Sequence, residues 1–380
     1  MDFSLTDEQA MFRNMAREFA SRHIEPVARD NDLTRHFPKE IIKEMSPLGL
    51  MGMTVPQQYG GLEVDHICYA LVVEEIARAC GAVAVSSFCC HSAVEEALIV
   101  WGNEAQKQKY LPSMCSGEIL GCYAFAEPAV EDNLASIETT AVPRGEQWIL
   151  NGTKASVANG GESQLALVIA QTDKDKGAEG LAAFLVDGDT PGFSSQNGYD
   201  TMGLRASNTA DIVLHECSIS SENLLGKVGD GLGTVNTILG NSRFSLSACY
   251  VGIAQACVDA SVSYAQERQQ FGQPIANFNM VQEMIAEMIV DTEASRLLLH
   301  RVGDLKNRGL PFTSELDIAK YYASQAVLEA TTNAVQVHGG YGYTMDYPVE
   351  RFLRDAATAT LWEGTPTEHK LAAARHALEI

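Results

Sequence analysis

The chain has 380 residues, which is enough for two or three domains that each bury a core. It carries 27 basic and 49 acidic residues, and the formal net charge of −22 argues against nucleic acid or an anionic membrane as a partner. An apolar fraction of 46% with 20% charged residues is ordinary for a globular protein in water.

The cysteines and the N-terminus indicate a cytoplasmic protein. No pair of cysteines has C-x-x-C spacing, so the sequence predicts neither a metal site nor a disulfide framework. The first residues, Met1–Ser4, lack the features of a signal peptide. The longest uncharged apolar stretch, 244–258, is too short to span a bilayer. The nine cysteines are Cys68, Cys80, Cys89, Cys90, Cys115, Cys122, Cys217, Cys249 and Cys257.

Residues 1–120 predict a helical domain. Thr6 is followed three residues later by Gln9, which is the pattern of a capping box at a helix start. Apolar residues then recur at helical spacing from Met11 to Phe19. Pro26 is expected to interrupt this helical pattern.

Residues 121–226 predict a small antiparallel β domain. Short runs rich in Val, Ile, Leu and Thr alternate here with Gly, Asn, Asp and Pro, and helical periodicity is lost. The pair Asn151-Gly152 predicts a tight turn between two strands.

Residues 227–380 predict a helical bundle. Long amphipathic segments cover 233–268, 280–308 and 314–337, and shorter ones cover 349–360 and 367–380. The expected fold class is therefore α+β, with an N-terminal helical domain, a middle antiparallel β domain and a C-terminal four-helix bundle.

Two breaks within 336–365 combine features that suit chemistry. Gly339 and Gly340 can adopt positive φ and present bare backbone N–H groups, which suit a phosphate at a helix end. Glu363 lies between Trp362 and a glycine, so desolvation is expected to raise its pKa and make it a candidate general base. A nicotinamide-binding Rossmann enzyme is disfavoured, because no G-x-G-x-x-G follows a strand.

The stretch from Gln336 to Thr365 resembles the C-terminal signature of the acyl-CoA dehydrogenase family, and further marks of that family recur along nearly the whole chain. The resemblance implies an FAD-dependent oxidoreductase that introduces a 2,3 double bond into an acyl-CoA thioester. It also implies a homotetramer in which FAD lies between the β domain and the bundle and is reached by a neighbouring subunit. Electron-transferring flavoprotein or another acceptor would then reoxidise the flavin.

The resemblance also assigns cofactor contacts. In 267–274, Arg268 matches an arginine that meets the FAD pyrophosphate, and Phe271 matches a residue near the adenine. The alternative is that Arg268 is a helix-end cation and that the glycines are helix caps. The complete set of expected FAD-binding residues is Tyr123, Phe125, Ala126, Asp132, Ser156, Ala158, Arg268, Phe271, Gln336, Gly339, Gly340, Thr365 and Thr367.

Glu363 matches the family's catalytic base, which removes the α-proton while the flavin accepts the β-hydride. The site must then stabilise an enolate, through the base's own backbone N–H and a flavin ribityl hydroxyl in the family. A glutamate at a helix break is otherwise most often a solvated charge. The expected substrate-binding residues are Arg243, Asp132, Gly364 and Trp362.

The acyl pocket is expected to be compact. The family's pocket floor corresponds to Cys89-Cys90-His91, which could equally be a buried histidine and two inert thiols. Trp362 is bulkier than the tyrosine common before the base, which favours a short, branched or alicyclic acyl group. Arg243 could serve either structure or substrate binding.

Six positions depart from the family's pattern. Ala126 and Ala158 replace threonines that bond the flavin ring, Ser156 replaces a shielding tryptophan, and Asp132 replaces a serine near the pyrophosphate. Asn279 and Thr367 stand where glutamines are usual. Three alternatives therefore remain: a dehydrogenase of carrier-protein thioesters, one with an unusual electron acceptor, or a non-redox binding or lyase paralogue.

Overall fold

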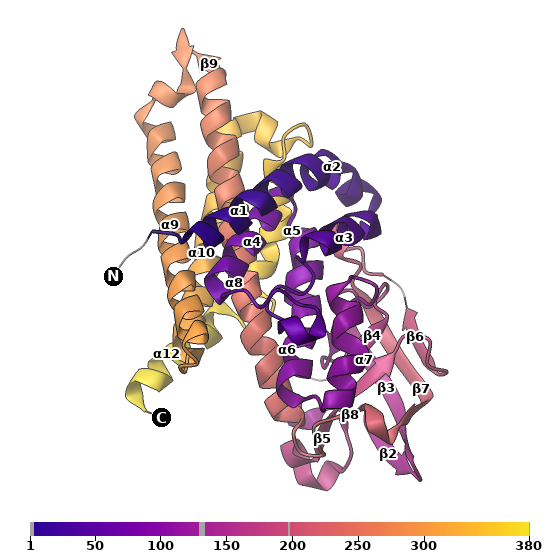
Figure 1. Cartoon of the computed structure of the whole chain (residues 1–380). Coiled ribbons are helices and arrows are strands. Elements are labelled where there is room, and N and C mark those ends of the chain that lie inside the picture. The colour runs from indigo at the N-terminus through magenta and orange to yellow at the C-terminus, as the bar shows by residue number, and fades with distance from the viewer. Residues whose placement is uncertain (1–3, 129–133, 197, 380) are drawn as a thin grey trace.

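The computed structural model describes residues 4–128, 134–196 and 198–379. Helices come first in the chain, a β-sheet follows, and long helices complete it (Figure 1). The fold class predicted from the sequence is confirmed, since an N-terminal helical domain, a middle β domain and a C-terminal helical domain are all present. The domain boundaries at 120 and 226 stay predictions.

The N-terminal domain begins with α1 (Asp7–Phe19), and Thr6 and Gln9 form the predicted capping box. Pro26 does not interrupt the helical path, because it occupies the first turn of α2 (Glu25–Thr34), where its missing N–H is not needed. A π-helical segment, 20–24, joins the two helices. The remaining helices are α3 (Lys39–Met45), α4 (His66–Ala79), α5 (Gly81–Ala84), α6 (Ser92–Trp101) and α7 (Glu104–Cys115).

The middle domain is an 8-stranded sheet in the order β6-β7-β3-β2-β4-β5-β8, with β1 also paired to β4. The sheet is mainly antiparallel, but β4 pairs in parallel with both β1 and β2, which the prediction of an antiparallel domain did not include. The strands are β1 (Gly121–Ala124), β2 (Thr140–Arg144), β3 (Gln147–Val157), β4 (Leu165–Gln171), β5 (Leu181–Asp187), β6 (Phe193–Gln196), β7 (Ala210–Ser220) and β8 (Leu224–Leu225).

β4 carries the core of the sheet because both of its faces are buried. Leu165, Leu167 and Ile169 pack in one apolar cluster with residues of α6 and α7. Ala166 and Val168 belong to a second cluster, formed between the strands on the other face. A continuous apolar run is typical of such a doubly covered strand.

The predicted turn at Asn151-Gly152 is wrong. Both residues lie inside β3, where the pairing with β7 shifts register between Leu150 and Gly152. Gly152 has φ of +155°, and a Cβ there would lie 2.3 Å from Thr139 Oγ1. The glycine thus serves a bulge with close backbone approach rather than a turn.

The C-terminal domain packs three long helices, α8 (Gly231–Glu267), α9 (Asn279–Asn307) and α10 (Thr313–His338), against one another. Two shorter helices, α11 (Val349–Ala356) and α12 (Pro366–Leu378), complete it. A small hairpin of β9 (Gln269–Gln270) and β10 (Gln273–Pro274) joins α8 to α9 and projects from the end of the bundle (Figure 1).

Two helical stretches, 81–101 and 231–267, are long and apolar enough to cross a bilayer by length and composition alone. Their most apolar windows are 83% and 78% buried inside the fold. This burial is what core helices show, so their apolarity is explained by packing.

Candidate active site

A tight turn at 361–364 carries the predicted base between α11 and α12. The next helix, α12, starts from Thr365, which forms a capping box with Glu368 and so fixes where the turn ends. Glu363 and Gly364 both have positive φ, +56° and +106°. A non-glycine residue in this region is uncommon and costs energy, which makes Glu363 a strained position worth explaining.

The Glu363 carboxylate points inward. The Tyr123 hydroxyl, from β1, donates a hydrogen bond to Glu363 Oε1 and lies 3.1 Å from Ser242 Oγ of α8. Glu363 Oε2 is buried, with no hydrogen-bond partner among the described residues. Burial raises the pKa of Glu363, as expected from the sequence, while the hydrogen bond from Tyr123, the nearby Ser242 hydroxyl and the charges of Arg243 and Lys320 oppose the rise.

Two cations hold the backbone on either side of this carboxylate. Arg243 Nε, from α8, donates to the Glu363 carbonyl oxygen at 2.9 Å. Lys320 Nζ, from α10, donates to the Trp362 carbonyl oxygen at 3.2 Å and lies 5.1 Å from the centre of the Tyr250 ring. Lys320 is fully buried, and burial lowers its pKa to about 8, although the Glu363 charge opposes this.

A cavity of about 330 Å³ opens beside this turn. It brings together the predicted residues Phe125, Ala126, Arg243, Glu363, Gly364 and Thr365. Trp362 and Thr367 do not line it. The Trp362 ring packs against the main apolar core instead, and Thr367 is exposed on the first turn of α12.

An aspartate–histidine pair also lines this cavity. His369 Nδ1 lies 2.8 Å from Asp317 Oδ1, and Arg243 Nη1 lies 3.9 Å from the same oxygen. His369 packs under Gly364, where an added Cβ would come within 2.8 Å of its Nε2. Glycine at 364 is therefore required by both its positive φ and this contact.

The predicted pocket floor is fully buried. Burial, followed by the charge of Glu363, raises the pKa of the Cys90 thiol well above its usual value. His91 Nδ1 accepts a hydrogen bond from the Gly121 N–H at 3.1 Å, and its Nε2 lies 3.4 Å from Glu95. His91 is thus a buried histidine held by the fold, with inert thiols before it.

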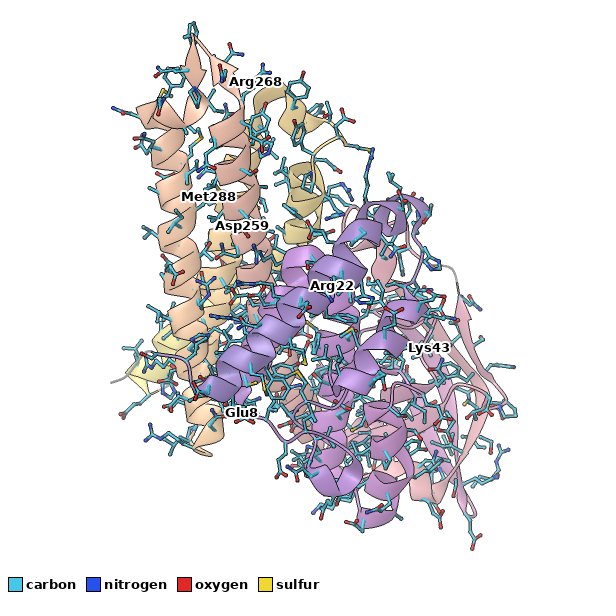
Figure 2. All side chains as sticks on the ribbon, turned by 45° about the horizontal axis from the view of Figure 1, so that its top comes forward. Glu8, Arg22, Lys43, Asp259, Arg268 and Met288 are labelled. Carbon is cyan, nitrogen blue, oxygen red and sulfur yellow. The ribbon has the colours of Figure 1, made fainter. Side chains whose placement is uncertain are left out.

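A second cavity, of about 520 Å³, lies at the opposite end of the bundle and contains Arg268, Gly339 and Gly340. Arg268 Cζ is 5.5 Å from the centre of the Tyr341 ring, and Figure 2 shows Arg268 at the end of the bundle, beside the projecting hairpin. Gly339 has φ of +60°, and a Cβ on either glycine would meet no atom within 4 Å. This open cradle with a guanidinium fits a diphosphate.

Other predicted cofactor residues lie outside that cavity. Gln336 is exposed on the last turn of α10, and Phe271 at the hairpin tip is 92% exposed. In the β domain, Ala126 and Ser156 are exposed, whereas Ala158 is buried. Ser156 has φ of +54°, and its N–H donates to Asp211 at 3.0 Å. Asp132 lies outside the described residues.

Comparison with known proteins identifies the class. Three family models match the chain: the N-terminal domain of acyl-CoA dehydrogenase over residues 6–118, the middle domain over 122–217 and the C-terminal domain over 229–378. The chain therefore belongs to the acyl-CoA dehydrogenase family.

Individual relatives agree along the whole chain. An acyl-CoA dehydrogenase of Bacillus subtilis is 40% identical over 374 residues, covering 98% of this chain and 99% of the relative. The structure of butyryl-CoA dehydrogenase from Megasphaera elsdenii superposes with a TM-score of 0.97 at 34% identity, over 100% of both chains. A structure described as electron transferring flavoprotein of Acidaminococcus fermentans gives a TM-score of 0.98 at 36% identity, over 100% of both chains.

The protein is accordingly an FAD-dependent oxidoreductase that acts on acyl-CoA. The residues present fit this cofactor at its diphosphate, because Arg268 has no carboxylate partner among the described residues and the glycine cradle beside it is open. At positions 126 and 158, where the family resemblance predicts contacts with the flavin ring, the alanines offer no side-chain hydrogen bond, so the expected donors are missing there.

Four residues at the base were not found from the sequence: Tyr123 as a direct contact of the carboxylate, Lys320, Asp317 and His369. Tyr123 was expected only near the flavin. The other three carried no motif, because Asp317 and Lys320 lie on α10 and His369 on α12, and no short sequence pattern links them to the base turn. The one usable signal was a lysine within an apolar helical run, which is costly unless it has partners.

Proposed function

We propose that Glu363 is the base that removes the α-proton of an acyl-CoA thioester. The observation that carries this proposal is the buried carboxylate at a strained turn on the wall of a cavity, where Oε2 has no hydrogen-bond partner among the residues that the structure describes. A desolvated carboxylate is a stronger base than one in water, and an unpartnered oxygen is free to receive a proton.

The chain's own groups would prepare the proton transfer. Tyr123 orients Oε1 and leaves Oε2 for the α-hydrogen, and Arg243 holds the backbone of the base. The apolar walls would exclude water while negative charge develops on the thioester oxygen. The chemistry that FAD supplies when bound is that of an acceptor for the β-hydride. Its diphosphate would be held by Arg268, Gly339 and Gly340.

We further propose a short acyl group. The fully buried thiols of Cys89 and Cys90 and the ring of Tyr123 crowd the base, which leaves little room for a long chain. The similar butyryl-CoA dehydrogenase acts, by its name, on a four-carbon acyl group. Branched and alicyclic groups of similar size remain candidates, and a binding screen of CoA thioesters would rank them.

Assembly and electron transfer complete the proposal. The chain would form a homotetramer in the cytoplasm, and electron-transferring flavoprotein or another acceptor would reoxidise its flavin. Support comes from the hairpin tip, where Phe271 is 92% exposed, and from Tyr343, which is 90% exposed close to the glycine cradle. A neighbouring subunit would cover these rings and complete the nucleotide site.

The test is Glu363→Gln. The amide keeps the shape of the side chain but cannot accept the proton, so the fold and bound FAD should remain while substrate no longer removes the yellow flavin absorbance. Loss of a general base typically lowers the rate by about 10²–10⁴-fold. Stopped-flow absorbance with butyryl-CoA in the absence of oxygen measures this, and reduction at the parental rate would refute the assignment.

A further inference from the structure

At the base turn, the carbonyl oxygens of two consecutive peptide groups each accept a hydrogen bond from a cationic side chain. The carbonyl of Trp362 accepts a hydrogen bond from the Lys320 ammonium, and the carbonyl of Glu363 accepts one from the Arg243 guanidinium. The donors come from different helices, α10 and α8, so the two cations approach the turn from separate elements. Hydrogen bonds from charged donors are about twice as strong as neutral ones.

The other ends of these peptide groups are free. Within the described ranges, neither the Glu363 N–H nor the Gly364 N–H donates to any protein group. Backbone N–H groups at a buried site almost always find a partner. Glu363 and Gly364 are half-buried and both line the cavity, so a ligand seated there could accept from these two successive donors.

We propose that Lys320 acts through the Trp362–Glu363 peptide group to strengthen the Glu363 N–H as a donor to the thioester oxygen. An ammonium on the carbonyl oxygen withdraws electrons from the whole amide, so the N–H at its other end becomes more positive. Hydrogen bonds in such a chain reinforce one another. Lys320 is thus a positioning and polarising residue, while Glu363 itself touches the substrate.

The step that gains from this polarisation is the α-proton transfer. The α-carbon–hydrogen bond breaks, the proton goes to the Glu363 carboxylate, and the electron pair moves into the thioester carbonyl, whose oxygen becomes an enolate oxygen. A donor that meets this growing charge stabilises the transition state more than the ground state. The proposal rests on the function proposed above, because it takes the thioester carbonyl as the acceptor.

The structure gives Lys320 no other evident role. It makes no ion pair within 4 Å among the described residues, and its remaining contacts are Ser324 Oγ at 3.4 Å and the face of the Tyr250 ring. Burying an ammonium with so little compensation is costly for stability alone. The other charged or titratable groups around the turn are Tyr123 from β1, Cys89 and Cys90 from the segment before α6, Arg243 and Tyr250 from α8, Asp317 from α10, and Glu368 and His369 from α12.

The test reads the enolate directly. Acetoacetyl-CoA has acidic α-protons and an enolate that absorbs in the near ultraviolet, so its ionisation can be titrated while it is bound to the FAD-loaded enzyme. Lys320→Met should lower the ionisation constant of the bound probe about tenfold. This is less than the ~10²–10³ effect of losing an entire oxyanion donor, because the N–H itself remains. Lys320→Arg, which keeps a charged donor, should stay within about threefold of the parent.

Lys306→Met is the matched control. Lys306 is also shielded from water, and its Nζ lies 5.3 Å from the centre of the Phe244 ring and 5.1 Å from that of Phe312. It donates a hydrogen bond to Asn241 rather than to the base turn. This variant should ionise the probe as the parent does. Equal losses in Lys306→Met and Lys320→Met, or no loss in Lys320→Met, would overturn the proposal. If Lys320→Met does not fold, Lys320→Gln against Lys320→Arg gives the same comparison.

The background Glu363→Gln separates the two proposals. Ionisation of the probe at equilibrium needs no particular base, so Lys320→Met should still weaken it about tenfold in this background. Lys320→Met could weaken ionisation of the probe in the Glu363→Gln background while Glu363→Gln alone still reduces flavin at the parental rate. This pair of results would support the polarising role of Lys320 and reject only the assignment of Glu363 as the base.

Discussion

The two cavities of the bundle differ in how complete they are within one chain. Around Glu363, side chains from the β domain and from α8 and α10 converge, and the carboxylate is buried. Around Arg268, a Cβ added to Gly339 or Gly340 would meet no described atom within 4 Å, and Phe271 and Tyr343 are almost fully exposed.

This difference indicates that the proposed proton transfer and the binding of the FAD diphosphate depend on different parts of the chain. A single chain supplies the described surroundings of the proposed base, with its raised carboxyl pKa and the two cations that bind the backbone beside it. The cradle for the nucleotide is only half enclosed. We therefore expect changes in the first cavity to affect chemistry, and changes in the second to affect FAD retention and assembly.

The largest effect is expected in the open cavity from Arg268→Ala. A hydrogen bond to a charged group contributes about 1.5–3 kcal/mol, so FAD should dissociate more readily by about 10–150-fold. Fluorescence of released FAD measures this, and light scattering should show that the proposed tetramer dissociates more readily. Arg308→Ala, which removes an exposed arginine paired with Asp304, is the control and should retain FAD. Equal FAD retention in both variants would place the diphosphate elsewhere.

The next effect tests the flavin face of the β domain. Restoring Thr at positions 126 and 158 and Trp at 156 should tighten FAD, because each neutral hydrogen bond adds about 0.5–1.5 kcal/mol. Together the two hydroxyls should slow FAD dissociation about tenfold, and the tryptophan should slow reoxidation in air. If FAD dissociation and reoxidation both stay unchanged, these three positions do not contact the flavin in this protein, although the resemblance to the family assigns them there. The burial of Ala158 is compatible with that outcome.

A smaller effect is expected inside the closed cavity from Tyr123→Phe. The Tyr123 hydroxyl favours the charged form of Glu363, so its loss should raise the pKa of that carboxyl further. The base works only when it is ionised, and the rate of flavin reduction therefore falls as pH drops through its pKa. Removal of the hydroxyl should move this acid limb to higher pH and slow the reaction about fivefold at neutral pH. An acid limb at its parental position would show that this bond does not tune the base.

The smallest expected effect concerns the rate of flavin reduction at alkaline pH, which we expect to depend on Lys320 rather than on Glu363. Lys320 has a pKa lowered to about 8, so it loses its proton, and with it the polarising charge, as pH rises through that value. Flavin reduction should decline modestly above this pH. In Lys320→Arg the decline should vanish, because arginine stays protonated throughout. A decline that is the same in both proteins would assign it to another group.

The sequence predicted most of what depends on local order. The capping box at Thr6, the helix end at Gly339 and the turn at Gly364 all follow from neighbouring residues. The Asn151-Gly152 prediction failed, because pairing with β7 and a bulge overrode a local turn preference. Tyr123 and Lys320 were missed as partners of the base turn because they meet it across 240 and 42 residues of chain. No local pattern records such contacts.

The most direct test of the central assignment is the isotope sensitivity of flavin reduction. Butyryl-CoA carrying deuterium at both α-positions should reduce the enzyme's flavin more slowly than unlabelled butyryl-CoA in stopped-flow without oxygen, and the slowing should be largest at low pH, where Glu363 is only partly ionised. This result would show that breaking the α-carbon–hydrogen bond limits the rate of flavin reduction, and its pH dependence would match a carboxyl base with the raised pKa of Glu363. Identical rates for labelled and unlabelled thioester across the whole pH range would contradict it.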